Sequence, residues 1–451
     1  MNRLVPRSIL VLLLSALLTS TAWGSAGEAS RGTGGQASRG GGQPAYHVTK
    51  LASLGGTYSS GSSINNLSWV AGPSDRKGDE VRHAALWRRG SLVDLGTLGG
   101  PNSSVVWPVK NVRGVITGIA ETHSIDPLDE DWSCSAFFPS RTGRTCLGFR
   151  WRDGKMRALP TLGGNNGFAT GTNNRLQTVG WAENTVHDRT CVAPQVLQFR
   201  AVIWGPDDGQ IRQLAPLPGD SVSAATAIND RDQVVGISGS CDRAVGRFSA
   251  IHAVLWEHGH PTNIGNLGGV AWNTPMAINQ RGAVVGFSNV SANDGGAFAA
   301  HAFLWTKSDG IRDLGTLPGD VYSQALGVNE RLQVVGLSCS AGFARCRAFV
   351  WQDGVMTDLN TLVASRYSDH LTTANDINDL GQITGDAVEQ ATGASVAYLA
   401  RPFASTCADL GEATPQTMPA APSGATRVTL PEAARQTLMA RSGLRSADLG
   451  R

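Results

Sequence analysis

Residues 277–286 of this chain of 451 residues read Ala-Ile-Asn-Gln-Arg-Gly-Ala-Val-Val-Gly, and residues 301–305 read His-Ala-Phe-Leu-Trp. Residues 313–317 then read Asp-Leu-Gly-Thr-Leu. Related phrases recur along the chain at a period of about 50 residues, which is the sequence signature of a repeat protein. The repeat unit therefore decides the fold.

Two positions of the first phrase and one of the second recur most regularly. A Gly follows each repeat Asn at a constant offset, and the third segment ends in Trp in every repeat but the last, where residues 396–399 read Val-Ala-Tyr-Leu. The Asn–Gly pairs are Asn65–Gly72, Asn111–Gly118, Asn173–Gly180, Asn229–Gly236, Asn279–Gly286, Asn329–Gly336 and Asn378–Gly385. The tryptophans are Trp87, Trp151, Trp204, Trp256, Trp305 and Trp351.

Each repeat divides into four short strands. The first ends at Ile-Asn, the second runs through Val-Val-Gly, the third is His-Ala-Phe-Leu-Trp, and a Gly-containing turn leads to the fourth. Asn suits the first corner because it tolerates left-handed backbone and hydrogen-bonds its own turn. A four-stranded unit of about 50 residues has the size of a propeller blade. The sequence thus predicts an all-β fold, a seven-bladed β-propeller.

The ends of the chain support the count of seven blades. The last repeat has three strands and stops near Arg401, while residues 47–56 resemble the fourth strand seen at residues 93–100. We therefore expect the N-terminal strand to complete the last blade, which leaves no exposed sheet edge. A linear β-solenoid is the alternative, and it does not need the missing strand.

Residues 46–402 resemble the extracellular HAF repeat proteins, named after the phrase present here at His301-Ala302-Phe303. The resemblance implies an exported bacterial protein with a propeller-like fold, and it brings no established activity that could be transferred to particular residues. This chain departs from the phrase in places: Arg200 and Arg347 replace the His, and residues 147–151 read Leu-Gly-Phe-Arg-Trp.

The segments outside the repeats have other compositions. Arg3 and Arg7 precede an apolar run and small residues, so residues 1–24 are predicted to be a cleaved signal peptide and the protein to be secreted or periplasmic. Residues 25–44 are rich in Gly and Ser and predict a flexible linker, residues 45–402 form the predicted propeller, and residues 403–451 form a low-complexity tail. Within the tail, Thr429 begins a capping-box pattern that predicts one short helix.

Charge and hydropathy exclude some classes of function. The formal net charge is +2, so nothing indicates nucleic-acid binding. No stretch after the leader approaches the ~20 apolar residues of a transmembrane helix. Seven cysteines in an exported chain favour disulfides over thiol chemistry. The expected pairs are Cys134–Cys146, Cys339–Cys346 and Cys191–Cys241, with Cys407 left over.

Three histidines, His83, His252 and His301, occupy one repeat position. A ring of metal ligands is one interpretation, but Arg stands at equivalent positions, and both side chains can instead donate to a carbonyl of the adjacent blade. The structural interpretation is preferred. His258 and His260 lack the cysteine or carboxylate spacing of a metal site. No nucleophile elbow, phosphate loop or dinucleotide fingerprint is present, so no catalytic residue and no cofactor are predicted, although calcium remains an option.

The variable loops are the place to look for binding. Second-to-third-strand loops and blade connections should emerge on one face, and the long loops carry the cysteines. Acidic and aromatic residues there fit a sugar, peptide or calcium site, or equally a solvated rim. The candidate binding residues are Trp107, His123, Asp126, Asp129, Asp131, Trp132, Asp188, Trp272, Asp320 and Tyr322.

Three functions remain open on these grounds. The preferred one is a binding or scaffold module that presents its loop-rich face to a protein or a glycan. The second is a carbohydrate-active hydrolase or lyase, which would need two carboxylates about 5 to 10 Å apart in a cleft. The third is a structural protein of an envelope or matrix. The fold alone cannot separate them.

Overall fold

Short runs of β-branched and aromatic residues, bounded by Gly, Asn and Asp, form antiparallel strands throughout the repeats. A computed structural model describes residues 45–130, 136–242, 246–291, 297–364, 367–403, 428–441 and 444, all of which belong to the unit Gln43–Arg451. The prediction of an all-β fold with four-stranded repeats is confirmed for this part of the chain.

Strands with the same place in the repeat are structurally equivalent. First strands are β2 (Gly55–Ser59), β3 (Ser63–Ile64), β7 (Gly99–Ser104), β11 (Gly163–Thr172), β15 (Val222–Ile228), β19 (Thr274–Ile278), β23 (Tyr322–Val328) and β27 (His370–Ile377). Second strands are β4 (Val70–Arg76), β8 (Ile116–Ile125), β12 (Thr178–His187), β16 (Val234–Gly239), β20 (Val284–Asn289), β24 (Val334–Cys339) and β28 (Ile383–Val388). Third strands are β5 (Arg82–Arg88), β9 (Arg144–Arg152), β13 (Leu197–Trp204), β17 (His252–Glu257), β21 (Ala300–Thr306), β25 (Cys346–Gln352) and β29 (Ser395–Pro402). Fourth strands are β6 (Ser91–Asp94), β10 (Lys155–Ala158), β14 (Ile211–Gln213), β18 (His260–Asn263), β22 (Gly310–Asp313) and β26 (Val355–Asp358).

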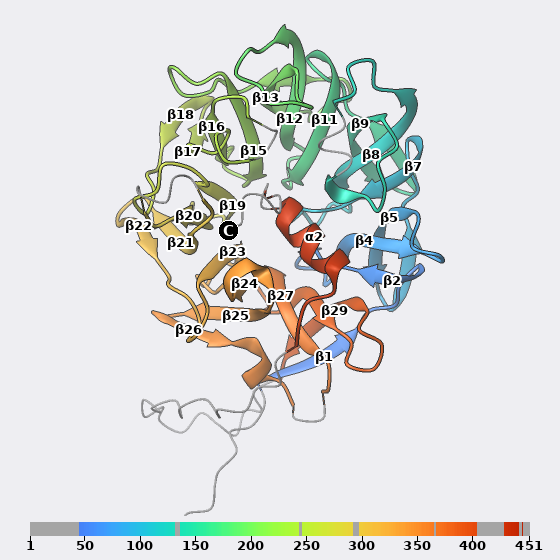
Figure 1. The fold of residues 1–451 in the computed structure, drawn as a ribbon, viewed down its shortest axis with the longest axis vertical. Coiled ribbons are helices and arrows are strands. Elements are labelled where there is room, and N and C mark those ends of the chain that lie inside the picture. Colours follow the sequence, from blue (N-terminus) through green and yellow to red (C-terminus); the bar gives the residue numbers. More distant parts are fainter. Residues whose placement is uncertain are drawn as a thin grey trace, which may run out of the picture. The chain divides into compact units, whose positions relative to one another are not determined.

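The strands pair in chain order. Five four-stranded antiparallel sheets contain β7–β10, β11–β14, β15–β18, β19–β22 and β23–β26. The remaining strands form one sheet, in which β2 and β29 share a single parallel pair, Tyr58↔Ser395. The N-terminal strand β1 (Tyr46–Lys50) pairs with β29, as predicted. In Figure 1 the first strands β15, β19 and β23 lie toward the middle of the view and the fourth strands β18, β22 and β26 toward its periphery.

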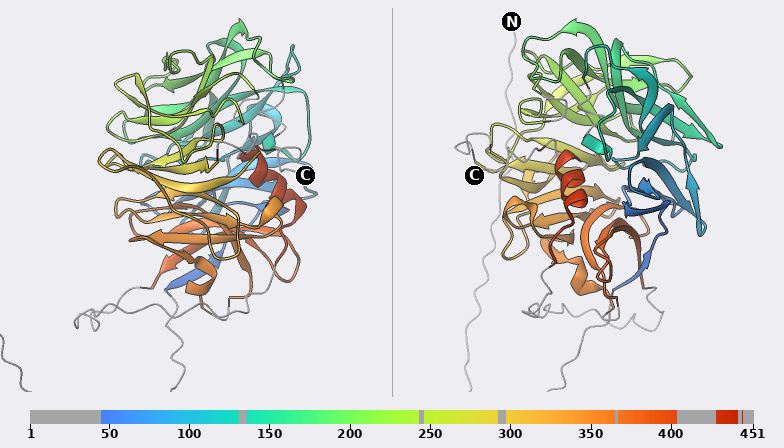
Figure 2. Two further views of the ribbon diagram at one scale, coloured as in Figure 1. Left: turned by 60° about the vertical axis from the view of Figure 1, so that its left-hand side comes forward. Right: turned by 45° about the vertical axis from the view of Figure 1, so that its right-hand side comes forward.

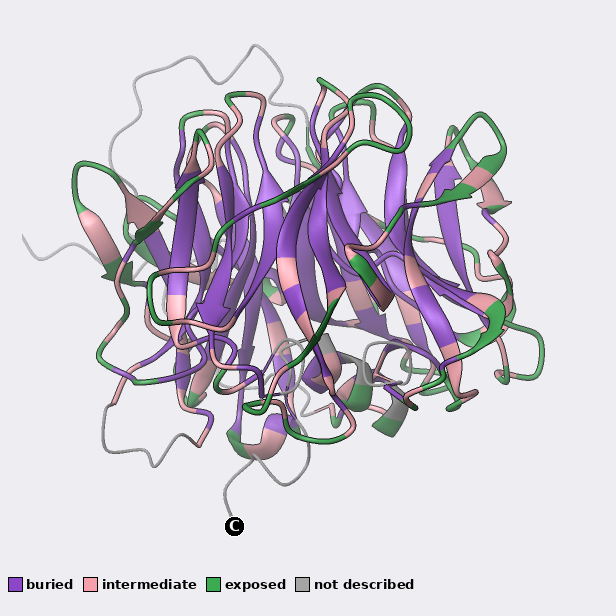
Figure 3. Ribbon diagram, turned by 90° about the horizontal axis from the view of Figure 1, so that it is seen from above, coloured by how far each residue is buried: buried purple, intermediate pink, exposed green. Residues whose placement is uncertain are grey.

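The core lies between neighbouring sheets. Figure 3 shows the buried residues concentrated in the strands. Five repeat tryptophans are buried and Trp305 is partly buried, so the interpretation of the tryptophans as core residues is confirmed. Their indole N–H groups also find partners: Trp204 donates to Pro160 O (2.8 Å) and Trp256 to Ala215 O (2.7 Å), each in the preceding repeat.

The Asn turns connect each repeat to the next. Asn279 Oδ1 accepts from the N–H groups of Arg281 and Ala283, and its Nδ2 donates to Asn329 O at 3.1 Å. Equivalent donations to the next repeat start from Asn65, Asn173, Asn229, Asn329 and, returning to the first repeat, Asn378; Asn111 instead donates to Thr172 O. The predicted side-chain bond within the turn is thus confirmed. The expected left-handed backbone at Asn is wrong, because the third residue after each Asn, for example Gly282 (φ 87°), has that conformation.

The C-terminal tail contributes one helix among the described residues. The helix predicted after Thr429 is α2 (Glu432–Arg441). Two short 3-10 helices, η1 (Ala341–Phe343) and η2 (Leu359–Leu362), lie within repeats. No helix in the described part of the chain is long and apolar enough to cross a membrane.

Candidate functional site

One face of the repeats carries the variable loops. Because the strands alternate in direction, the second-to-third-strand loops and the connections between repeats lie on one face, and the Asn turns lie on the other. We call the first the loop face; it comprises the β4–β5, β8–β9, β12–β13, β16–β17, β20–β21, β24–β25 and β28–β29 loops and connections such as β18–β19 and β22–β23. This is the face on which binding residues were expected.

Two disulfides between described residues hold loops on this face. Cys191–Cys241 joins the β12–β13 loop to the β16–β17 loop of the next repeat, and Cys339–Cys346 closes the β24–β25 loop. Both predicted pairs are confirmed. Cys134 and Cys407 lie outside the described residues, so the Cys134–Cys146 pair stays a prediction. An oxygen of Asp188 lies within 4.8 Å of both sulfur atoms of Cys191–Cys241, but sulfur atoms in a disulfide are not thiolate ligands.

The repeat histidines bond to aspartates. His83 Nδ1 lies 2.8 Å from Asp94 Oδ1, and its Nε2 lies 3.2 Å from Pro101 O. His252 contacts Asp220 at 2.9 Å and His301 contacts Asp313 at 3.0 Å. The expected contact with a carbonyl is confirmed for His83, and the aspartate partners were not foreseen.

Arg347 takes the same role in its repeat. Its guanidinium bonds to Asp320 (2.7 Å), to Asp358 (3.3 Å) and to Pro318 O (3.0 Å). At His252 and Arg347 this position ties the third strand to a connection between repeats, and at His83 it ties the third strand to β7 of the next repeat. His301 bonds instead to Asp313, at the end of the fourth strand β22.

The aspartate partner of His83 has a shifted pKa. Burial would raise the pKa of Asp94, but the bonds from His83 and the Gly96 N–H lower it below its ordinary value.

Two of the predicted aromatic binding residues are buried in the core, and Tyr322 is partly buried against it. Trp107 and Trp272 are each 1% exposed. Trp107 packs edge-on against Phe168, with ring centres 5.1 Å apart. Trp272 and Tyr322 come together at the Phe298 ring, with centres 5.6 and 5.5 Å away. Trp107 and Trp272 therefore offer no open ring face for stacking with a ligand.

The predicted polar binding residues are scattered. Asp129 is exposed and pairs with Arg141, His123 is exposed at the end of β8, and Asp320 is held by Arg347. Asp188 is half-buried and accepts from Thr190 N–H (2.9 Å). Asp126 is buried among polar partners on the neighbouring repeat. Asp131 and Trp132 lie outside the described residues. These side chains do not form one common site in the described part of the chain.

Helix α2 lies against the loop face. Figures 1 and 2 show it at one side of the sheets, across the middle of the view in Figure 1. Leu430, Leu438, Met439 and Leu444 share an apolar cluster with side chains from the repeats, among them Trp107, Trp272, Phe298 and Phe343. The Leu430 N–H donates to Ala344 O (3.1 Å). The C-terminal segment thus covers the apolar middle of the face on which a binding site was expected.

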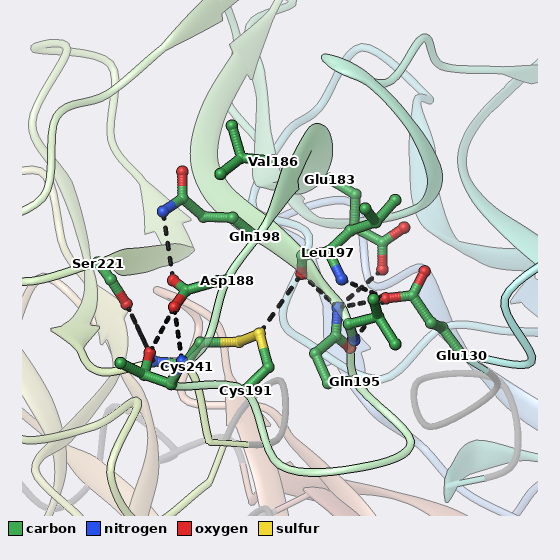
Figure 4. The surroundings of a disulfide bond; sticks show 12 residues. Glu130, Glu183, Val186, Asp188, Cys191, Gln195, Leu197, Gln198, Ser221 and Cys241 are labelled. Carbon is green, nitrogen blue, oxygen red and sulfur yellow. Dashed lines mark hydrogen bonds between the residues drawn. A yellow bond between two sulfur atoms is a disulfide. The ribbon is translucent and has the colours of Figure 1, made fainter.

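A buried acidic cluster lies between the second and third repeats. Asp126 and Glu130 come from the β8–β9 loop, and Glu183 comes from β12, next to Gln195. Glu130 Oε1 accepts from the N–H groups of Val196 and Leu197. Figure 4 shows the Glu130 and Glu183 carboxyl groups and the Gln195 amide converging beside Leu197.

The electrostatics of this cluster are unusual. Burial, and then the Glu130 carboxylate, raise the pKa of Glu183 to about 8, although bonds from Gln195 and Asn166 lower it. Burial also raises the pKa of Glu130, against the lowering effect of the Leu197 and Val196 N–H groups. The sequence prediction omitted Glu183 and Gln195; a charged residue inside an otherwise apolar second strand was the only available signal.

The opposite face has a small polar cavity of about 120 Å³ bordered by the Asn turns. In several repeats the side chain that follows the repeat Asn accepts from the equivalent N–H of the preceding repeat: Asp230 accepts from Asn174, Gln280 from Asp230, and Glu330 from Gln280. These carboxylate and amide oxygens join neighbouring turns and are engaged in doing so. Lys110, at the edge of the cavity, pairs with the buried Asp376.

Comparison with known proteins gives a distant likeness of fold. No protein-family model and no curated protein matches the chain. Among solved structures, it is similar to Pyrococcus horikoshii acylaminoacyl peptidase (10% identity, TM-score 0.44, 76% of this chain and 52% of that one) and to a prolyl endopeptidase (9%, 0.44, 80% and 50%). Porphyromonas gingivalis dipeptidyl peptidase 4 is also similar (13%, 0.32, 73% and 42%). The chain spans about half the length of these proteins, and at this level no activity is transferred from them.

Proposed function

We propose that this protein is an exported seven-bladed β-propeller, closed by its N-terminal strand, that binds a protein partner through its loop face. Two observations support closure: β1 pairs with β29, and Asn378 donates to Asn65 O at 3.0 Å, from the last repeat to the first. We also propose membership of the HAF repeat proteins and export through residues 1–24. Sequencing a mature N-terminus close to residue 25 would support the export.

Exposed apolar side chains on the loop face are the observation that carries the proposed function. Six large apolar residues there are 42% to 63% exposed, and they come from the second, third, fourth and fifth repeats and the connections that follow. They are Ile125, Val186, Val192, Phe248, Val270 and Val321. The disulfide Cys191–Cys241 anchors the loops that carry Val192 and Phe248. Exposed apolar side chains on anchored loops favour a protein partner.

A glycan is less well supported as the ligand. Sugar binding uses exposed aromatic rings, and Trp107 and Trp272 are buried. The enzyme alternative needs two carboxylates in an open cleft. Among the described residues, Glu183 and Glu130 are enclosed, and Asp230 and Glu330 accept bonds from backbone N–H groups. These four carboxylates therefore give no support to glycoside cleavage.

Site-specific photo-crosslinking in the producing cells tests this function. A crosslinking amino acid is placed at Val192 or Val321 on the loop face and, as matched controls, at Leu67 or Leu380, which are equally exposed on the Asn-turn face. We expect one discrete adduct from the loop-face positions and none from the controls. Adducts only with a second copy of the chain would favour the structural role, and specific hits of the oxidised protein on a glycan array would favour a glycan.

A further inference from the structure

The acidic cluster between the second and third repeats holds buried charge without a described basic partner. Asp126, Glu130 and Glu183 are 4%, 0% and 1% exposed. The groups that act on the pKa of Glu183 and Glu130 are carboxylates, amides and backbone N–H groups, and none is a described Lys, Arg or His. Buried carboxylates need a compensating positive charge or a proton.

In each of the two glutamates, one carboxylate oxygen accepts backbone hydrogen bonds and the other does not. Glu183 Oε2 accepts from the N–H groups of Asn165 (3.2 Å) and Asn166 (2.8 Å), and its Oε1 has only the Gln195 amide at 3.0 Å. Glu130 Oε1 accepts two backbone N–H groups, whereas no group reaches hydrogen-bond geometry at its buried Oε2, although the Asn165 side-chain amide is near enough to lower the pKa of Glu130. Each carboxylate therefore keeps one oxygen that the backbone does not use.

The Gln195 amide has more acceptors than it can serve. Its Nε2 lies 3.3 Å from Glu130 Oε1, 3.0 Å from Glu183 Oε1 and 2.7 Å from Leu197 O, although an amide nitrogen carries two hydrogens. Its buried Oε1 has no partner. Turning the amide over would place Oε1 among these oxygens, an arrangement that needs either a bound cation or a proton on one of the carboxylates.

Asp126 lies beside this group and is already engaged. Its oxygens accept from Leu128 N–H (2.9 Å) and from the side-chain amides of Asn165 (3.4 Å) and Asn166 (2.6 Å). Asp126 therefore positions the neighbouring turn and adds negative charge without supplying a free ligand atom.

We propose that Glu130, Glu183 and Gln195 form a binding site for one divalent cation, and that this cation is calcium. The ligand atoms are all oxygens from two carboxylates and an amide, the set that calcium prefers, and calcium accepts irregular geometry. Magnesium demands a near-ideal octahedron, which this irregular set of groups does not provide, whereas calcium takes six to eight oxygens in flexible geometry, so water would supply the ligands that the three residues do not. The bound ion fastens the β8–β9 loop to the third repeat.

Calorimetric titration of the chelator-treated, oxidised mature protein with calcium tests the site. We expect one ion per chain with a Kd between about 1 µM and 1 mM, the range of sensor sites and extracellular modules. Glu130→Gln and Glu183→Gln should each weaken binding at least about tenfold, which corresponds to ~1.4 kcal/mol. Calcium should also raise the Tm of the wild-type protein by about 2 °C or more and shift the two variants much less.

Glu121→Gln is the matched control. Glu121 occupies the equivalent place in β8 and is equally buried, but its oxygens are satisfied by Asn102 and Thr142. This variant should bind calcium like the wild type. Circular dichroism in chelator establishes that each variant is folded.

Two results would overturn the proposal. One is the absence of both heat and Tm shift at 5 mM calcium, on the order of the weakest extracellular modules, with folded wild-type protein; a proton would then neutralise the cluster. The other is an equal loss of binding in Glu121→Gln, which would place any ion elsewhere.

Discussion

Seven glycines, each seven residues after a repeat Asn, owe their identity to a close contact. A Cβ atom on any of them would lie 1.8 to 2.1 Å from a carbonyl oxygen of the first strand of the same repeat. None of them has a positive φ. A register shift in the first strand, such as that between Ala225 and Ala227 opposite Gly236, accompanies this approach. Only glycine fits there.

Replacing one of these glycines should destabilise the protein strongly. In Gly236→Ala the new Cβ meets Ala224 O, and we expect a loss of about 3 kcal/mol or more, the upper range of overpacking. Gly171→Ala is the control, because the nearest atom to its Cβ would be 3.4 Å away and its φ is not positive; its loss should stay below about 1 kcal/mol. Urea unfolding followed by Trp fluorescence compares the two, and equal midpoints would refute the steric explanation.

At the scale of the structural element, the Asn turns and the disulfide-bonded loops connect neighbouring repeats. The Asn turn uses one amide to hold its own backbone and to reach the next repeat. On the other face, Cys191–Cys241 spans 50 residues and joins loops of two repeats, whereas Cys339–Cys346 spans 7 residues within one loop. Removing the Asn side chain or either disulfide should lower the free energy of unfolding by different amounts.

Replacing the repeat Asn should destabilise the protein more than replacing the residue that follows it. Asn279→Ala removes two acceptor bonds and the donor bond to Asn329 O, and leaves buried backbone groups unpaired. We expect a loss of about 2 to 4 kcal/mol. Gln280→Ala removes one half-buried acceptor, used by Asp230 N–H, and should cost about 1 kcal/mol or less. The two unfolding midpoints measure the difference, and the reverse order would contradict this account of the turn.

The stabilisation from each disulfide should increase with the length of chain that it encloses. The loop-closure relation gives about 4 kcal/mol for the Cys191–Cys241 loop and about 2 to 3 kcal/mol for the Cys339–Cys346 loop. Double Ser variants of each pair, compared under oxidising conditions, test this ranking. An equal loss from both would mean that local packing, and not chain entropy, decides the effect.

At the scale of the whole molecule, the C-terminal helix belongs to the core. Leu438 and Met439 are 7% and 3% exposed, in a cluster with apolar side chains from the repeats, whereas Gln436 on the same helix is exposed. The chain therefore returns to the loop face after its last repeat. Any partner of that face therefore meets a surface whose apolar middle is already covered by the C-terminal segment.

Removing this helix should uncover apolar surface without unfolding the sheets. A chain ending at residue 403 should bind the dye ANS, because the apolar cluster that the helix covers becomes exposed, and should keep its β-type circular dichroism. Each large apolar side chain of the helix contributes about 1.5 to 3 kcal/mol to the packing of the helix on the repeats. Leu438→Ala should lower stability by about 2 kcal/mol or more, and Gln436→Ala should leave it within about 0.5 kcal/mol. If the truncated chain bound no dye, the helix would not be covering the cluster.

The sequence alone determined the all-β class, the four strands of each repeat, the pairing of the N-terminal strand and two disulfides. These features follow from local periodicity, because one repeat of about 50 residues contains the signals for strand length, turn residues and the position of each cysteine. The C-terminal helix was also predictable, because its start at Glu432 lies within one turn of the capping-box pattern that begins at Thr429.

Only the tertiary structure decided which side chains are exposed and which polar groups meet. Trp107 and Trp272 were expected to be exposed, but Trp107 lies between β7 and β8 and Trp272 on the β18–β19 connection, and both are buried by neighbouring repeats and the C-terminal helix. Glu130 and Glu183 lie on different repeats and meet because the β8–β9 loop crosses to the next sheet. Local sequence sets strand and turn, whereas burial and charge proximity depend on contacts between distant segments, and no short-range pattern encodes those.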